Sequence, residues 1–195
     1  MATIKSVCVY CGSSSNVRQS HRDAARELGT GLASAGIRLV YGGGQIGLMG
    51  LIADAALAAG GAVTGIIPKF LDELEIGHTG CTELIVANNM HDRKYEMASI
   101  ADAFVILPGG FGTLDELFET LTLIQTQKIR KKVPIVLYGK EFWDRVVDFQ
   151  ALAEFGVIGA ADLKLFHRSD SVDDAFEYLT QELAEHHLMD ASPSM

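Results

Sequence analysis

The sequence predicts an α/β fold, a Rossmann-like doubly wound parallel sheet in a single domain. Runs rich in Val and Ile alternate with longer segments of helical periodicity, the pattern of a parallel sheet covered by helices. Glycine clusters stand where the expected strands end. The length of 195 residues, with 48% hydrophobic and 21% charged residues, suits one core. We expect one domain over residues 1–188 and a disordered tail over residues 189–195.

The first half of the chain alternates expected strands with helices. The strands are SVCVYCG, IRLVYGGG, AVTGIIP and TELIVAN, and the helices cover residues 17–35 and about 47–59. The first helix carries an apolar stripe, and the second ends at a glycine pair. The polar stretch over residues 69–81, between the third and fourth strands, is expected to be mobile.

The second half continues the alternation. A helix over residues 90–101 leads to the strand DAFVILPGG, and the next helix opens at Thr113. The apolar face of that helix should pack on the sheet and consists of Leu114, Leu117, Leu121 and Ile124. The strand VPIVLYG, a helix around 141–155, a short strand near LKLFHRS and a last helix from about 171 complete the chain.

Charge and hydropathy exclude several classes of partner. The formal net charge of −9 argues against a nucleic-acid surface, because duplex binding draws on neutralising many phosphates. The basic stretch QKIRKK follows an expected helix and complements the carbonyl end of its dipole. No stretch reaches the roughly 18 apolar residues of a membrane span, and the start MATIKSVCVYCGSS runs directly into a strand pattern instead of a signal peptide. We expect a cytoplasmic protein with neither nucleic-acid nor membrane partners.

The cysteines form an odd set, which argues against a disulfide framework in a cytoplasmic protein. Cys8-x-x-Cys11 and His78-x-x-Cys81 offer ligands at spacings that a zinc site could use. However, Cys8 lies inside an apolar strand pattern and Cys11 begins a Gly/Ser turn. We therefore interpret these cysteines as buried or turn thiols and predict no metal ion.

Glycine-rich turns follow three of the expected strands: GSSS after the first, GGG after the second and GGFG after FVIL. The carboxyl ends of the strands in a doubly wound sheet meet at one edge, where ligands bind. Residues of all three turns are therefore candidate substrate contacts, and they include Ser14, Gly43, Gly109, Gly110 and Gly112.

The third turn has the features of a phosphate site. Its glycines let the backbone approach an anion, and the amides that open the following helix carry a partial positive charge. Thr113 adds a hydroxyl donor. The pattern is neither the Walker motif, since no lysine follows the last glycine, nor G-x-G-x-x-G. A tight strand-to-helix turn without a ligand is the alternative.

Asp115 and Glu116 follow this turn and have a local structural explanation. Thr113-x-x-Glu116 has the spacing of a capping box, in which the glutamate side chain returns to the amide of the cap residue. Asp115 suits the first turn of a helix because of the dipole. From this local pattern alone, both carboxylates would be structural.

Arg93 favours a functional role for these carboxylates. Its spacing to Met97 and Ile100 places it on the line of the apolar stripe of its helix. The guanidinium should therefore emerge at the end of the sheet rather than on the outer surface. A surface pair with Glu96, one turn further on, is the alternative.

The motifs MHDRK (90–94) and PGGFGTLDE (108–116) strongly resemble those of the LONELY GUY (LOG) family of cytokinin riboside 5'-monophosphate phosphoribohydrolases. The resemblance extends through VCVYCGSSS, YGGGQIGLMG and GIIPKFL and covers most of the chain to about residue 140. It implies hydrolysis of the N-glycosidic bond of an adenosine-type 5'-monophosphate, N6-substituted or plain. The products are ribose 5-phosphate and the free base, a cytokinin or adenine, and no cofactor is required.

The resemblance also implies which residues act. Arg93 and Glu116 match the catalytic positions, and members are homo-oligomers, commonly dimers, with the site near the subunit boundary. The positions that contact the nucleotide are matched by Glu83, Arg93, Lys94, Gly109, Gly110, Gly112, Thr113, Glu116 and Thr122. Cleavage of the glycosidic bond builds oxocarbenium character on the ribose, which a carboxylate at the position of Glu116 would stabilise.

Two other functions remain as alternatives. Members of the family have often been labelled lysine decarboxylases, but pyridoxal phosphate chemistry needs a Schiff-base lysine and a partner for the pyridine nitrogen in a large fold. The sequence shows no such arrangement. A nucleotide-binding or carrier module could use the same glycine turns without turnover. The presence of both Arg93 and Glu116 favours the enzyme, because a pure binder needs no carboxylate at the anomeric carbon. The sequence leaves open the preferred base, dimer against higher oligomer, and whether Glu116 is nucleophile, base or electrostatic stabiliser.

Overall fold

The structure, a computed structural model, describes residues 5–74, 76–126 and 133–190, with the backbone only for residues 183–190. The basic residues that the sequence suggested at a helix end (Lys128, Arg130, Lys131 and Lys132) lie outside these ranges, as do residues 191–195 of the expected tail. The last helix, α8 (Val172–Asp190), continues through the first residues of that tail.

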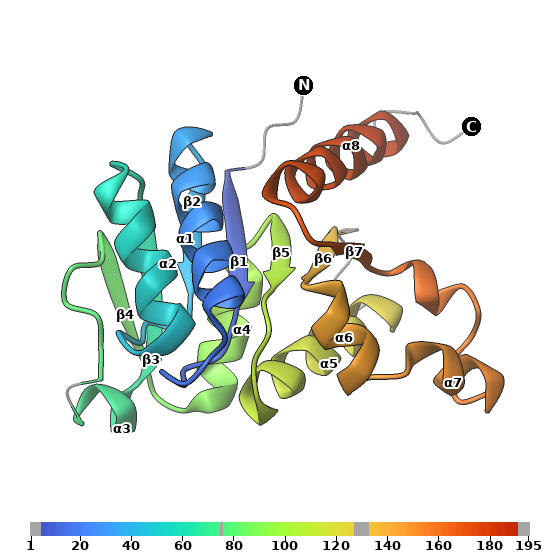
Figure 1. The fold of residues 1–195 in the computed structure, drawn as a ribbon, viewed down its shortest axis with the longest axis horizontal. Coiled ribbons are helices and arrows are strands. Elements are labelled where there is room, and N and C mark those ends of the chain that lie inside the picture. The colour runs from blue at the N-terminus through green and yellow to red at the C-terminus, as the bar shows by residue number, and fades with distance from the viewer. Residues whose placement is uncertain (1–4, 75, 127–132, 191–195) are drawn as a thin grey trace.

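Seven parallel strands form one sheet in the order β4-β3-β2-β1-β5-β6-β7 (Figure 1). The strands are β1 (Ser6–Tyr10), β2 (Arg38–Tyr41), β3 (Val63–Pro68), β4 (Glu83–Ala87), β5 (Ala103–Ile106), β6 (Ile135–Tyr138) and β7 (His167–Ser169). The chain builds outward from β1 to β4 and then returns to the other side of β1 with β5. This reversal is the switch point at which doubly wound sheets bind ligands. The predicted fold class is confirmed.

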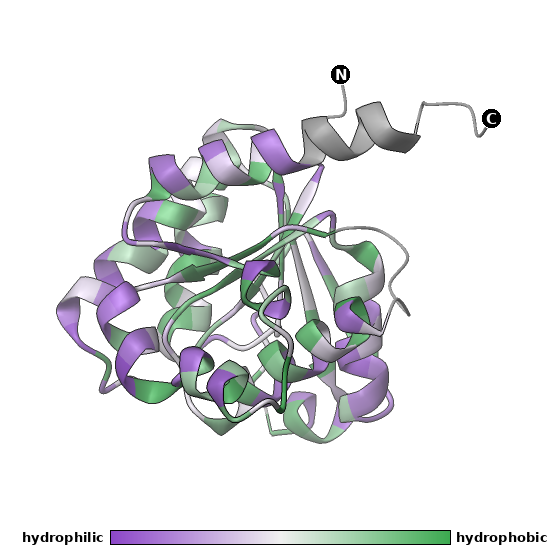
Figure 2. Cartoon of the chain, turned by 90° about the vertical axis from the view of Figure 1, so that its right-hand side faces the viewer, coloured by the Kyte–Doolittle hydropathy of each residue, from purple (hydrophilic) through white to green (hydrophobic). Residues whose placement is uncertain are grey.

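Helices cover both faces of the sheet (Figure 1). One face carries α1 (Gln19–Ser34), α2 (Gly47–Ala58) and α8; the other carries α4 (Met90–Ile100), α5 (Phe111–Gln125), α6 (Lys140–Val146) and α7 (Phe149–Glu154). The connections include the short helices α3 (Lys69–Asp72) and η1 (Asp162–Lys164). Figure 2 shows green strands inside this arrangement and purple positions on the outward sides of the helices. Within the described ranges, no helix is long and apolar enough to cross a membrane.

The central strand β1 contributes to both halves of the core. Val7 and Val9 belong to the cluster beneath α1, α2 and α8, whereas Cys8 and Tyr10 belong to the cluster beneath α4 to α7. Successive side chains of a strand point to opposite faces, so a strand covered on both sides needs a continuous apolar run. Every residue of β1 is buried, which explains the composition of SVCVY.

The expected helix around 141–155 is wrong in one respect, because the structure divides it into α6 and α7. Val147 is extended, and the carboxylate of Asp148 accepts a hydrogen bond of 2.9 Å from the amide of Ala151. This is the geometry of a helix N-cap, so Asp148 begins a second helix rather than continuing the first.

Two further expectations differ from the structure. The helix expected to open at Thr113 begins at Phe111, with Gly110 as the cap residue. The stretch over residues 69–81, expected only as a mobile connection, contains α3 and a bridge between Gly44 and Gly77. That bridge brings the connection against the turn after β2.

Candidate active site

A cavity of about 490 Å³ opens at the carboxyl edge of the sheet, at the switch point. The turns after β1 and β2 and the start of α5 contribute backbone to its lining. The charged residues of its lining are Arg93, Lys94, Asp115 and Glu116. The large apolar residues of its lining are Ile46, Met49, Ile67, Leu71, Ile76 and Met90. This mixed lining suits a ligand with both polar and apolar groups.

Arg93 and Glu116 form a buried ion pair across the cavity. Arg93 Nη1 donates to Glu116 Oε1 at 2.6 Å, and the two side chains are only 7% and 6% exposed. Arg93 Nε donates to the carbonyl oxygen of Ile66 at 3.0 Å, at the end of β3. The bond to Glu116 replaces the surface pair with Glu96 that the sequence left as an alternative. The guanidinium is therefore held from both sides, which fixes the direction of the Glu116 carboxylate.

Gly42 makes room for the guanidinium of Arg93. A Cβ atom at Gly42 would lie 2.0 Å from Arg93 Nη2, a distance that no packed side chain can tolerate. The arginine therefore gives the first glycine of the GGG turn a structural reason of its own. The sequence analysis missed this role, and it missed the carbonyl of Ile66, because neither lies near Arg93 in the chain.

Lys94 joins α4 to α5 beside that pair. Its Nζ lies 2.9 Å from Asp115 Oδ2 and 2.5 Å from Glu119 Oε2, and its side chain is 10% exposed. Burial lowers the pKa of Lys94, but the hydrogen bonds and charges of Glu119 and Asp115 outweigh burial and raise it above its ordinary value. Asp115 thus binds a lysine while Glu116 binds an arginine. Glu119 is a residue of this site that the sequence analysis did not identify.

Glu116 is buried, with only 5% of its surface exposed. Burial raises the pKa of the Glu116 carboxyl above its ordinary value, and the adjacent Arg93 opposes part of that rise. Burial likewise raises the pKa of the Cys11 thiol, which also lines the cavity and therefore stays protonated at neutral pH. Glu116 is thus a buried carboxyl group of the cavity, and Arg93 favours its ionised form.

The start of α5 does not form the capping box that Thr113 and Glu116 suggested. Gly110 is the cap residue, no side chain caps the helix, and Thr113 lies inside the first turn with 3% exposure. A Cβ atom at Gly109 would lie 2.1 Å from Thr113 Oγ1, so the threonine packs against that glycine. The capping interpretation is wrong because α5 begins two residues before Thr113, so Thr113 is not the cap residue, and because Glu116 pairs with Arg93.

The remaining glycines of this turn have no structural reason of their own. A Cβ atom at Gly110 or at Gly112 would meet no atom within 4 Å, and neither residue has a positive φ. Both line the cavity, where the first amides of α5 lack partners within the helix. An anion could approach the backbone here more closely than any side chain would permit.

The structure does not bring every predicted contact to this cavity. Glu83 is the first residue of β4, at the opposite edge of the sheet, and its carboxylate lies 3.5 Å from Arg38 Nη1. At about 3.3 Å per residue, the length of β4 separates it from the cavity. Thr122 donates to the carbonyl of Phe118 at 2.7 Å and lines a different, smaller cavity. The single chain does not bring Glu83 and Thr122 to this cavity. Their contacts with substrate stay predictions.

Ser14 and Gly43 lie close to the cavity without lining it. Gly43 has a φ of +73° and sits against Ile67, so it shapes the turn between two cavity residues, Gly42 and Gly44. Ser14 and Gly109 instead line a second cavity next to the first. Their contacts with substrate remain predictions.

The cysteines do not assemble the zinc site that their spacing allowed. Cys8 and Cys11 are buried, and Cys81 Sγ lies 3.3 Å from the hydroxyl of Tyr41. His78 Nε2 pairs with Asp54 at 3.0 Å. In the part of the chain that the structure describes, no group of three or more His, Cys, Asp or Glu side chains could hold a metal ion.

A doubly wound sheet with a buried charged pair beside a glycine-rich helix start defines a Rossmann-like α/β protein with a candidate anion site at the switch point. The chain belongs to the LOG family; the family model that matches residues 49–179 carries the description "Possible lysine decarboxylase". Lys94, which lines the cavity, is held by two carboxylates.

Curated relatives carry a different name. Cytokinin riboside 5'-monophosphate phosphoribohydrolase LOG7 of Arabidopsis thaliana is 40% identical over 189 residues, which cover 92% of this chain and 87% of the relative. The enzyme LOG of Oryza sativa subsp. japonica is 47% identical over 147 residues, which cover 75% of this chain and 60% of LOG. LOG1 of Arabidopsis thaliana is 53% identical over 121 residues, 62% of this chain. The chain spans only 60% and 57% of the lengths of LOG and LOG1.

Solved structures show the same fold. The molybdenum cofactor carrier protein of Chlamydomonas reinhardtii superposes with a TM-score of 0.68 at 24% identity, covering 93% of this chain and 99% of the carrier. At this identity the likeness concerns the arrangement of the sheet and helices alone.

Proposed function

We propose that the chain hydrolyses the N-glycosidic bond of adenosine-type 5'-monophosphates to a free base and ribose 5-phosphate. The observation that carries this proposal is the buried Arg93–Glu116 pair, with 2.6 Å between Nη1 and Oε1, in one cavity with the glycine-rich start of α5. The names of relatives that are 40% to 53% identical support the same reaction.

The reaction assigns separate parts to the start of α5 and to Glu116, one turn further along the helix. The 5'-phosphate binds the amides from Gly110 to Thr113, where the helix dipole favours an anion. Glu116 lies three residues further, about 4.5 Å along the axis, which suits the distance from a phosphate to the sugar ring. Its carboxylate faces the positive charge that develops on the ribose as the bond to the base breaks. Arg93 positions that carboxylate and favours its ionised form, against the effect of burial.

The apolar lining of the cavity supports a base with an apolar N6 substituent. Ile46, Met49, Ile67, Leu71 and Ile76 line the same cavity as the charged pair. Burying a prenyl group on N6 would add about 25 cal/mol of binding free energy for each Å² of apolar area removed from water. We therefore expect prenylated adenosine 5'-monophosphate to be a better substrate than AMP.

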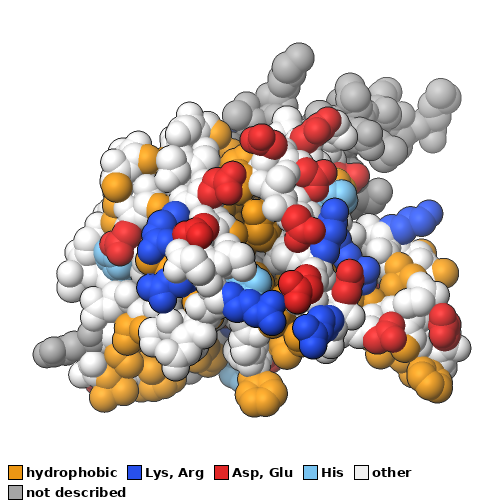
Figure 3. Space-filling model, viewed as in Figure 1, with side chains coloured by type: hydrophobic (Ala, Val, Ile, Leu, Met, Phe, Trp, Pro, Cys, Tyr) orange, Lys and Arg blue, Asp and Glu red, His pale blue; other side chains and the backbone are white. Residues whose placement is uncertain are grey.

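A homo-oligomer is part of this proposal. Large apolar side chains on α3, α4 and α5, which all contribute to the cavity lining, are exposed: Phe70 at 51%, Tyr95 at 73% and Phe111 at 93%. Figure 3 shows hydrophobic side chains gathered along the lower edge of the molecule, in the region where Figure 1 places α3. Exposed apolar patches commonly mark protein interfaces. A cytoplasmic location is also proposed, in keeping with free cysteines at positions 8, 11 and 81.

The test compares four substrates in one free-base assay: isopentenyladenosine 5'-monophosphate, AMP and the two corresponding nucleosides. We expect free base from both monophosphates, faster from the prenylated one, and little from the nucleosides, because these lack the group that binds α5. Equal rates with adenosine and AMP would show that the amides of α5 bind no phosphate. Light scattering on the same sample measures the oligomeric state.

A further inference from the structure

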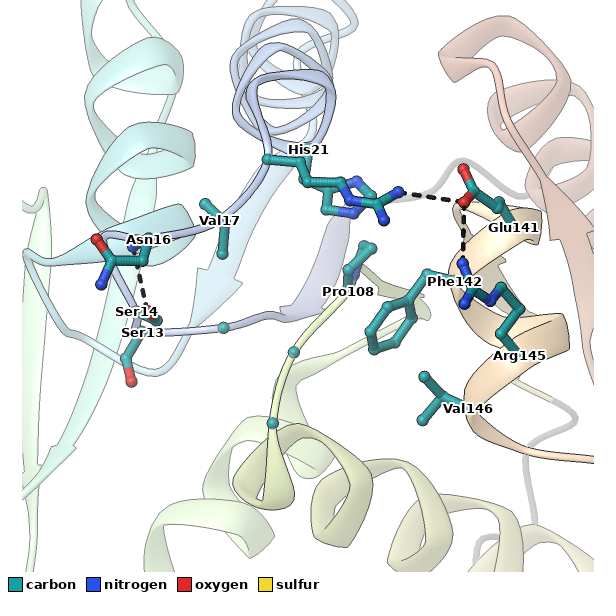
Figure 4. Close-up of a pocket in the computed structure, with 14 residues that line it drawn as sticks. Ser13, Ser14, Asn16, Val17, His21, Pro108, Glu141, Phe142, Arg145 and Val146 are labelled. Carbon is teal, nitrogen blue, oxygen red and sulfur yellow. Dashed lines mark hydrogen bonds and ion pairs between the residues drawn. The ribbon is translucent and has the colours of Figure 1, made fainter.

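A second cavity, of about 620 Å³, adjoins the reaction cavity. Gly12, Ser13 and Gly110 line both cavities, so the two meet at the start of α5. Figure 4 shows the second cavity between the turn after β1, the segment at Pro108 and helix α6, which contributes Glu141, Phe142 and Arg145. Apart from the predicted substrate contacts of Ser14 and Gly109, the proposed hydrolysis of a monophosphate assigns no role to this space.

The second cavity has donors for an anion. Arg18 Nη1 and Arg145 Nη1 lie 3.1 Å and 3.6 Å from the same carboxylate oxygen of Glu141. These side chains are 64%, 72% and 69% exposed, so the ion pairs are weak and can exchange for a ligand. Each guanidinium has five N–H donors, and one carboxylate cannot occupy the donors of both. In a chain with a net charge of −9, this is a local cationic group.

An apolar wall faces these donors. Val17, Pro108 and Phe142 line the cavity, and the ring of His21 contacts that of Phe142 edge-on with 6.3 Å between centroids. Burial and the charge of Arg18 lower the pKa of His21, so its imidazole is neutral at pH 7 and can donate one hydrogen bond and accept another. The cavity therefore suits an anionic group attached to a larger molecule better than a free ion.

We propose that this cavity binds the second phosphate of a nucleoside 5'-diphosphate, so that the chain binds diphosphates as well as monophosphates. The inference rests on the proposed function, which places the first phosphate on the amides that open α5. Gly110 belongs to that turn and to both cavities, so a group attached to the first phosphate extends towards Arg18 and Arg145. A diphosphate then competes with the monophosphate substrate for one continuous site.

The test is a competition assay with a product that the competitors cannot form. Release of isopentenyladenine from isopentenyladenosine 5'-monophosphate is followed with AMP or ADP as the inhibitor, and the readout is the ratio of the ADP to the AMP inhibition constant. Arg145→Ala should raise this ratio about fivefold, because the variant loses one partly exposed charge-assisted hydrogen bond to the second phosphate. Glu141→Gln should lower it, because the variant removes the carboxylate that competes with the ligand. Arg26→Ala, on α1 and paired with Asp23, is the matched control and should leave the ratio unchanged.

Three outcomes separate the claims. An ADP inhibition constant more than about a hundredfold above that of AMP in the wild type overturns the inference. An unchanged ratio in Arg145→Ala, or a change that Arg26→Ala reproduces, overturns it while leaving the proposed function intact. If the wild type releases no isopentenyladenine, the proposed function fails and this inference fails with it.

Discussion

Glutamine at position 116 keeps the shape of the side chain and removes its charge. Glu116 and Arg93 are 6% and 7% exposed, so Glu116→Gln leaves a buried guanidinium without its counter-ion. Removing one partner of a buried pair destabilises a protein by about 3–5 kcal/mol. The glutamine oxygen can still accept a hydrogen bond worth about 1 kcal/mol. We therefore expect the free energy of unfolding to fall by about 2–4 kcal/mol, which lowers the melting temperature by roughly 5–15 °C in a chain of this size.

The same substitution should lower the rate far more than it lowers substrate affinity. The glutamine has no negative charge to face the cationic ribose, and removing such a group reduces turnover by about a thousandfold. The amides that open α5 are unchanged, so KM for the monophosphate should change by less than about threefold. The effect belongs to kcat because the charge matters chiefly in the transition state.

The assay combines a melting curve with free-base chromatography at a temperature where the variant is folded. Glu119→Gln is the matched control, since it makes the same chemical change one turn further along α5 and touches Lys94 instead of Arg93. A Glu116→Gln enzyme that retains more than about a tenth of wild-type kcat would refute the catalytic role and leave Glu116 as a structural partner of Arg93.

Other predictions concern the surroundings of the pair. The acid limb of kcat/KM should have an apparent pKa above the ordinary 4.5 of a glutamate, because burial raises the pKa of Glu116 and activity needs its ionised form; a pH profile with the limb at or below 4.5 would contradict this. Gly42→Ala should displace Arg93 and reduce kcat more than about a hundredfold, whereas Gly112→Ala, which meets no atom within 4 Å, should keep the fold and raise KM severalfold; equal kinetic effects would rule out these separate roles. Glu119→Gln should lower the free energy of unfolding by about 1 kcal/mol with a small effect on kcat, and a melting curve that matches the wild type would show that its bond to Lys94 contributes nothing.

The fold was predictable because local patterns along the chain carry it. Val7 and Val9 alternate with Cys8 and Tyr10 in a strand buried on both sides, and such runs separated by helices leave little choice of architecture. The broken helix at Val147 and Asp148 was harder, because a capping aspartate inside an apolar pattern looks the same as an exposed helical residue.

The site was only partly predictable for a related reason. The Thr113–Glu116 capping box is a pattern over four residues, whereas the bond that decides the direction of Glu116 comes from Arg93, 23 positions earlier. The contact of Arg93 with Gly42 and the bond from Lys94 to Glu119 also join residues far apart in the chain, at separations of 51 and 25 positions. Spacing rules do not include such contacts; they become visible only when the sheet brings β2, α4 and α5 to one edge.

The most direct measurement of the central claim follows both products of isopentenyladenosine 5'-monophosphate, the free base by chromatography and ribose 5-phosphate by mass spectrometry. With the wild type, we expect the two products in equal amounts and the nucleotide consumed, because Glu116 stabilises the cleavage of the glycosidic bond. Nucleotide that binds the chain but is recovered intact after many hours would contradict the account and would identify the cavity as a binding site without turnover.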